Sequence, residues 1–131
     1  MLHHIDIHVR NLAAARALFD GLAEHIGYRV LTDEPEFVGY EMVGGGRPRF
    51  GLILDPHQRA GSTRIAFAVA TRSGVDVAAR IASDRGARVI EGPGVHAEYG
   101  DHYAVFFQDA DGNRYEIMAD EAAATTTGKA S

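Results

Sequence analysis

Cysteine is absent from the 131 residues of this chain. The protein therefore has no disulfide, no thiolate zinc site and no cysteine nucleophile, and a bound metal would need histidine, carboxylate or carbonyl ligands. Long apolar runs are also absent, so we expect no membrane partner. The opening segment MLHHIDIHVRN lacks the basic start and apolar core of a signal peptide, which makes a cytoplasmic location the expectation.

An excess of positive charge is lacking as well. Thirteen Lys and Arg residues stand against eighteen Asp and Glu residues, which gives a formal net charge of −5. The basic residues are scattered along the chain, whereas nucleic-acid binding usually requires clustered Lys and Arg. We therefore expect no nucleic-acid partner.

What is present is the composition of one ordinary globular domain. Apolar residues make up 46% of the chain and charged residues 24%, a balance that differs from that of disordered or membrane proteins. The closing letters ADEAAATTTGKAS are small, polar and without periodicity. We expect a single domain over residues 1–120 and a flexible tail over residues 121–131.

The first half of the chain predicts a strand, a helix and three further strands. Apolar and polar residues alternate from His4 to Val9, which is the period of a strand with one polar face. Asn11 can cap the helix that follows, and Gly27 is placed to end it. Further strands are predicted over residues 28–31, 37–43 and 49–54.

The same order of elements begins again at Arg64. RIAFAV alternates, a helix is predicted over residues 73–85, the letters ARVI repeat the earlier YRVL, and strands follow over residues 102–108 and 113–118. His4 and Arg64 are offset by 60 positions, and the two helix-ending glycines by 59. This spacing indicates an internal duplication, with modules over about 2–54 and 63–118 in an α+β fold.

Each predicted module leaves one face of its sheet without a helix. Packing these two faces around a shared cleft is the economical arrangement. The apolar residues of the two opening strands should then lie under the helices, and the alternate residues should face the cleft. The residues expected to face the cleft are His4, Asp6, His8, Arg64, Ala66 and Ala68.

Three segments carry a resemblance to a known family: LHHIDIHVRNLAAARALF, RIAFAV and FFQDADGNRYEIM. Over residues 2–118 the chain resembles the vicinal oxygen chelate (VOC) superfamily, which includes glyoxalase I, fosfomycin-resistance and bleomycin-resistance proteins and extradiol dioxygenases. The resemblance implies two tandem βαβββ modules that form a glyoxalase-like open barrel, with a divalent metal in the shared cleft.

The resemblance also implies four ligand positions, which are filled here by His4, Leu52, Arg64 and Glu116. His4 and Glu116 match the family pattern, whereas Arg64 stands where histidine is usual. A guanidinium cannot ligate a cation and would repel one. Three alternatives follow: a degenerate site at His4 and Glu116 for one divalent metal (Fe, Mn, Ni, Co or Zn), replacement of the metal by Arg64 paired with Glu116, or an Arg64 that extends to solvent.

A third metal ligand would have to come from His8, Asp6, His102 or a partner chain, because two ligands are too few. His102 alternates onto the cleft side of its strand, but strand rise places it roughly 13 Å from the Glu116 position. The glycine-rich segment 91–101 (EGPGVHAEYGD) is expected to be a lid or a long connection.

Two functions from different classes are consistent with these residues. The first is an enzyme of the VOC type, a lyase, isomerase or dioxygenase, that acts on a small oxygen-rich or anionic molecule with electrophilic assistance from a metal or Arg64. The second is a metal-free protein that sequesters a small molecule in a dimeric cleft. A homodimer is what the resemblance implies. The candidate catalytic residues are Glu116, His4 and Asp6, and the candidate substrate-binding residues are Arg64, His8, His102, Phe106 and Leu52.

Overall fold

A computed structural model describes residues 1–123 of the chain. The first module consists of β1 (His4–Val9), α1 (Leu12–His25), β2 (Tyr28–Glu34), β3 (Phe37–Met42) and β4 (Arg49–Leu54). The second consists of β5 (Arg64–Val69), α2 (Arg72–Asp84), β6 (Arg88–His96), a 3-10 turn (Ala97–Tyr99), β7 (His102–Gln108) and β8 (Arg114–Ala119). The predicted tail, from residue 121, lies mostly outside the described residues.

Local sequence signals set the limits of both helices. The Asn11 side chain accepts a hydrogen bond from the Ala14 N–H at 3.0 Å, and the Thr71 hydroxyl accepts one from the Gly74 N–H at the same distance. These caps satisfy backbone donors that a helix start leaves unpaired. Gly27 follows α1 with φ +83°, a backbone angle that residues with a side chain rarely adopt.

The two modules have the same sheet topology. The strand orders are β1-β4-β3-β2 and β5-β8-β7-β6, with β1 parallel to β4 and β5 parallel to β8. The opening strands β1 and β5 even share the same alternation of exposed and buried residues. The predicted α+β class and the duplicated βαβββ module are both confirmed.

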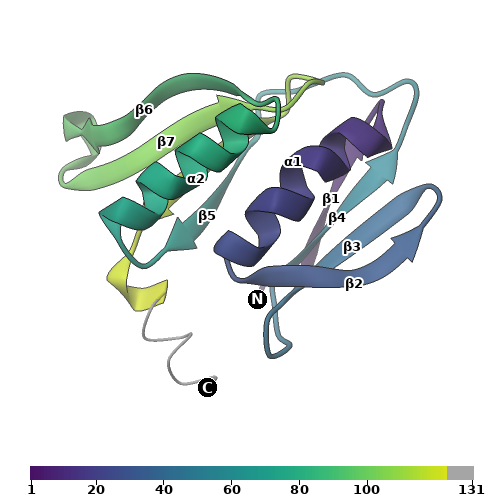
Figure 1. Cartoon of the computed structure of the whole chain (residues 1–131), viewed down its shortest axis with the longest axis horizontal. Helices are drawn as coiled ribbons and strands as arrows, with labels where there is room; N and C mark the ends of the chain where they lie inside the picture. The colour runs from purple at the N-terminus through teal and green to yellow at the C-terminus, as the bar shows by residue number, and fades with distance from the viewer. Residues whose placement is uncertain (124–131) are drawn as a thin grey trace.

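The helix-covered sides of the two sheets share one apolar core. Helices α1 and α2 lie side by side over the sheets, on the same side of the molecule (Figure 1). Phe19 of α1 contacts Tyr115 of β8, with ring centroids 5.1 Å apart, and Phe50 contacts Phe67 across the modules at 5.2 Å. The predicted core residues of β1 and β5 pack here. The sheets are not closed, and the helix-free side of each opening strand is exposed.

The turn between β7 and β8 joins the two modules. One carboxylate oxygen of Asp109 accepts hydrogen bonds from the N–H groups of Asp111 and Asn113, and the other accepts from the Tyr115 hydroxyl at 2.8 Å. Burial and the nearby Asp109 carboxylate raise the pKa of Tyr115. The Asn113 amide also donates to the His8 carbonyl of β1. This turn therefore fixes one end of the second sheet against the first module.

The glycine-rich segment that we predicted to be a lid or connection is mostly strand. β6 continues through His96 and pairs antiparallel with β7 up to His102. The prediction was wrong because the pairing register shifts between Val89 and Gly94, so the segment stays in the sheet without regular alternation. None of the helices in the described part of the chain is long and apolar enough to cross a membrane.

Candidate functional site

The helix-free face of the second sheet brings together three of the predicted site residues. Glu116 of β8 lies between its two cross-strand partners, Ala66 of β5 and Phe106 of β7. Cross-strand partners direct their side chains to the same face of a sheet. Arg64 is two residues before Ala66, and His102 is four residues before Phe106, so both belong to this face.

Glu116 is the centre of this group. One of its carboxylate oxygens, Oε2, lies 2.5 Å from Nε2 of His102, and the other, Oε1, lies 3.4 Å from Nε of Arg64. The Glu116 side chain is only 9% exposed, and a buried carboxylate is stable as an anion only when it is paired. We call Arg64, Glu116 and His102 the carboxylate-centred triad.

The contact between His102 and Glu116 corrects the sequence prediction. Strand rise alone separates their positions by roughly 13 Å, but that count follows the backbone only. Both side chains are long and lie on the same face, so their ends meet although their strand positions are not paired. The pairing of Arg64 with Glu116, one of the three alternatives raised by the sequence, is present as an ion pair.

An aromatic ring supports the guanidinium of the triad. The Arg64 guanidinium carbon lies 4.5 Å from the centre of the Phe106 ring, within the range of a cation–π interaction. Both residues line a pocket of about 290 Å³ on this face, together with Ile90, Gln108 and Arg114. Glu116 and His102 are not among the residues that line this pocket. Its concave surface combines two guanidinium groups with an aromatic wall, which suits a small anionic molecule.

The remaining polar candidates lie on the first module. His4 Nε2 lies 3.6 Å from the Asp6 carboxylate, and His8 Nδ1 lies 2.9 Å from the Asp55 carboxylate. The hydrogen bond from His8 lowers the pKa of Asp55. Within residues 1–123, no ion pair or hydrogen bond links His4, Asp6 or His8 to a side chain of the triad. The structure therefore divides the predicted site between two faces.

Leu52 does not face a cleft. It is the parallel partner of Ile7 and is fully buried in the helix-covered core. The residue beside Asp6 on the helix-free side is Gly51, where an added Cβ would lie 2.6 Å from the Phe37 ring. The prediction was wrong by one position, because β4 is apolar on both faces and its sequence does not show which residues point outward.

The residues present do not fit a divalent metal. Among the described residues there is no group of three or more His, Cys, Asp or Glu side chains that could hold one. Both oxygens of Glu116 already have partners, and one of these partners is the permanently charged guanidinium of Arg64. A cation bound to this carboxylate would be placed beside another positive charge, which is unfavourable.

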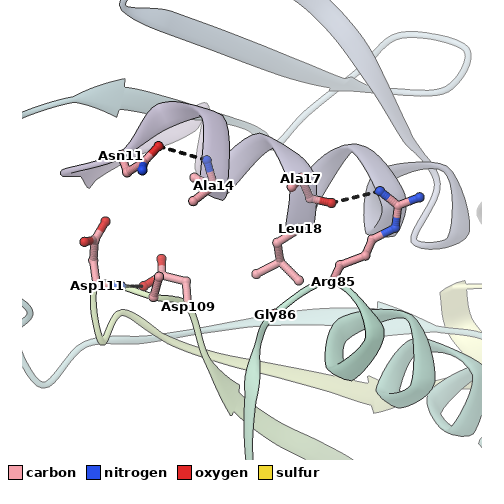
Figure 2. Close-up of a pocket in the computed structure, with 10 residues that line it drawn as sticks. Asn11, Ala14, Ala17, Leu18, Arg85, Gly86, Asp109 and Asp111 are labelled. Carbon is pink, nitrogen blue, oxygen red and sulfur yellow. Dashed lines mark hydrogen bonds between the residues drawn. The ribbon is translucent and has the colours of Figure 1, made fainter.

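Another pocket of about 270 Å³ lies between α1 and the β7–β8 turn (Figure 2). Its polar side chains hold the fold together: Asn11 caps α1, Arg85 donates to the Ala17 carbonyl at 2.9 Å, and Asp109 accepts from the turn. Alanine side chains form much of the remaining wall. Since its polar groups are engaged, this pocket is not our candidate site.

Sequence reasoning missed two residues of the site face, Arg114 and Gln108. Arg114 pairs with Arg64 on one side and with Gln108 on the other. The alternation of the strand could have identified Arg114, because it is two residues before Glu116 and must share its face. His96, from the segment predicted to be a lid or a long connection, is buried near the edge of this face, with its ring centroid 4.7 Å from that of Phe106.

Comparison with known proteins identifies solved structures that share the fold of this chain. No family model and no curated protein matches the sequence. Among solved structures, a glyoxalase/bleomycin resistance protein from Albidiferax ferrireducens T118 has a TM-score of 0.78 at 19% identity, over 92% of this chain and 98% of that chain. A glyoxalase/bleomycin resistance protein/dioxygenase family enzyme from Burkholderia phytofirmans PsJN has a TM-score of 0.72 at 19% identity, over 88% and 95%.

A genomically encoded fosfomycin resistance protein from Listeria monocytogenes, in complex with Mn(II) and 1S,2S-dihydroxypropylphosphonic acid, has a TM-score of 0.68 at 19% identity, over 91% of this chain and 89% of that chain. The chain therefore has the fold of these glyoxalase/bleomycin resistance proteins, which is the fold that the resemblance of the three sequence segments implied.

Proposed function

We propose that the protein is a metal-independent enzyme that moves a proton on a small anionic molecule bound at the helix-free face of the second sheet. The observation that carries this proposal is the position of Glu116 between the Arg64 guanidinium and the His102 imidazole. A fixed cation, a buried carboxylate and a histidine in one group supply the elements of acid–base catalysis without a metal.

His102 is the proposed proton carrier. Its Nε2 donates a hydrogen bond to Glu116, which leaves Nδ1 as the basic nitrogen of a neutral ring. No hydrogen bond joins Nδ1 to another side chain in the described residues, so this nitrogen is free to take a proton from carbon. Glu116 then stabilises the imidazolium that forms, in the way a buried carboxylate orients a catalytic histidine.

Arg64 is the proposed electrophile. Its Nε lies 3.4 Å from Oε1 of Glu116 in an ion pair, and its two terminal nitrogens are the proposed donors to a ligand oxygen. Removal of a proton next to a carbonyl moves the C–H electron pair onto that oxygen, and the guanidinium would stabilise the resulting enolate. Return of a proton from His102 completes an isomerisation or an exchange, with no oxidant or reductant required.

Hydrogen exchange at carbon tests this function directly. The protein is incubated in D2O with EDTA and with pyruvate, 2-oxobutyrate or phenylpyruvate, and the loss of the C3 proton signals is followed by NMR. We expect exchange with at least one acid. In His102→Gln and in Arg64→Gln, the exchange rate should fall by a factor of about 100 or more. His57→Gln, an exposed histidine in the connecting loop, is the matched control and should exchange like the wild type.

Absence of exchange with every acid would favour the second candidate, a protein that binds its ligand without changing it. The observation that favours this candidate is that both oxygens of Glu116 are already engaged. A metal titration distinguishes both candidates, the metal-independent enzyme and the binding protein, from a metalloenzyme. We expect no shift in thermal stability with Mn, Fe, Co, Ni or Zn for the wild type, and a gain in divalent binding for Arg64→His, which would be lost again on Glu116→Ala.

A homodimer is part of the proposal, because the cleft expected between the two faces would then be completed by a second copy. Exposed apolar residues on both edge strands support it: Leu31 of β2 is 48% exposed and Ile90 of β6 is 51% exposed. Both lie where the pairing register shifts, at equivalent positions of the duplicated module. His4, Asp6 and His8 of one copy would then contribute to the site of the other, in a protein that we expect to be cytoplasmic.

Sedimentation velocity over a range of protein concentrations tests the dimer. We expect a dimer of the wild type at micromolar concentration and a monomer for Leu31→Lys, because a charge would replace an apolar contact. Arg80→Glu, an exposed residue of α2, changes charge outside the sheet faces and serves as the control. A monomeric wild type would show that the helix-free faces of two copies do not form a shared cleft.

A further inference from the structure

One row of the second sheet carries three arginines and a glutamine. The strand register pairs Arg64 with Arg114, Arg114 with Gln108, and Gln108 with Arg88. These four residues therefore run across all four strands, next to one another and on the face that holds Glu116. We call them the arginine row.

The charge of this row is only partly neutralised within the chain. Arg64 pairs with Glu116, but no carboxylate forms an ion pair with Arg114 or Arg88 in the part of the chain that the structure describes. Like charges on neighbouring strands repel each other, so the row costs stability unless an anion binds to it. The protein as a whole has a formal charge of −5, so this local excess of arginine does not reflect its composition.

The pocket of about 290 Å³ lies directly at this row. Arg64, Arg114 and Gln108 form its polar side. Phe106 and the half-exposed Ile90 form its apolar side, together with the buried rings of Phe107 and Tyr115. A guanidinium presents paired N–H donors to a carboxylate or phosphonate, and the glutamine amide adds another donor. An aromatic ring and an isoleucine favour an apolar group.

We propose that the ligand is a small molecule with an oxyanionic group attached to an apolar or aromatic body. The oxyanion lies between Arg64 and Arg114, within reach of the Gln108 amide, and the body lies against Phe106 and Ile90. The orientation of the ligand rests on the proposed function, in which the reacting end of the ligand lies toward Glu116. Glu116 is two residues from Arg114, or about 7 Å along the strand.

Binding of four probes tests this assignment. Benzoate, phenylphosphonate, inorganic phosphate and neutral benzamide are titrated into the full chain by isothermal calorimetry at low salt, with the fold checked by circular dichroism. We expect benzoate or phenylphosphonate to bind more tightly than phosphate, and benzamide not to bind. Loss of one charge-assisted contact in Arg114→Gln should weaken the aromatic anion about tenfold. Arg80→Gln removes the same charge from α2 and should leave affinity unchanged.

The outcomes separate this inference from the proposed function. Weaker binding in Arg64→Gln but not in Arg114→Gln would overturn the arginine row and leave the triad in place. Equal affinity for benzamide and benzoate, or for phosphate and phenylphosphonate, would overturn the class of ligand. Tighter binding of benzoate than phenylphosphonate identifies a carboxylate ligand, and the reverse order identifies a phosphonate or phosphate ester; both support the row.

Discussion

The two arms of the carboxylate-centred triad should differ in strength, and double-mutant cycles can measure both. Glu116 contacts His102 at 2.5 Å and Arg64 at 3.4 Å. The His102 side chain is 18% exposed and that of Arg64 is 44% exposed, so solvent screens the second contact more than the first. A short, charge-assisted hydrogen bond between part-buried groups contributes about 1.5–2.5 kcal/mol. An ion pair open to water contributes about 0.5 kcal/mol.

The assay is urea unfolding followed by circular dichroism, since the chain contains no tryptophan. Each cycle compares Glu116→Ala, its partner replaced by alanine, and the double variant, all at one protein concentration so that association contributes equally. We expect the coupling of Glu116 with His102 to exceed its coupling with Arg64 by about 1 kcal/mol or more. Equal couplings, or the reverse order, would refute the geometry from which the mechanism is derived.

Three further predictions concern neighbouring parts of the fold. Gly51→Ala should lower the unfolding free energy by about 1–3 kcal/mol, measured by urea unfolding, because its Cβ would overlap the Phe37 ring. Tyr115→Phe should lower it by about 1–2 kcal/mol, since a buried hydrogen bond is lost. His8→Ala should raise the pKa of Asp55 toward 3.8 in a carboxyl NMR titration, and the stability from this pair, present above that value, should disappear as pH falls through the folded pKa.

The controls for these predictions are chosen to isolate each cause. Gly61→Ala adds the same methyl group where no atom lies within 4 Å, and it should change stability far less than Gly51→Ala. An equal effect of both alanines would contradict the steric explanation. If Tyr115→Phe left the unfolding curve unchanged, the hydrogen bond to Asp109 would make no net contribution to the free energy of unfolding. An unchanged Asp55 pKa in His8→Ala would show that the pair does not form.

The fold could be predicted from the sequence because each module repeats the same local signals. Alternation in β1 and β5, the Asn11 cap and the Gly27 and Gly86 endings are read from neighbouring residues alone. The offset of about sixty residues then indicates the duplication. The strand and helix signals each depend on residues close together in the chain, so a single sequence is enough to detect them.

The site was only partly predictable, because it depends on register and side-chain reach. Leu52 was assigned to the wrong face since its strand is apolar on both sides. The reach of His102 to Glu116 depends on two side chains whose strand positions are not paired. Arg114 was overlooked although alternation places it on the face of Glu116. Arg64 was the informative departure from the family pattern, because a pair with Glu116 was one of the three alternatives that it raised.

The central claim is that Arg64, Glu116 and His102 form one site in which Nε2 of His102 donates to the carboxylate. Long-range 15N–1H correlation spectra of the histidine rings, recorded at pH 8 for the wild type and Glu116→Gln, measure this most directly. We expect Nε2 of His102 to carry a proton in the wild type, and its signal to shift in the variant while that of His57 does not. An unprotonated Nε2, or a His102 spectrum identical in both proteins, would contradict the claim.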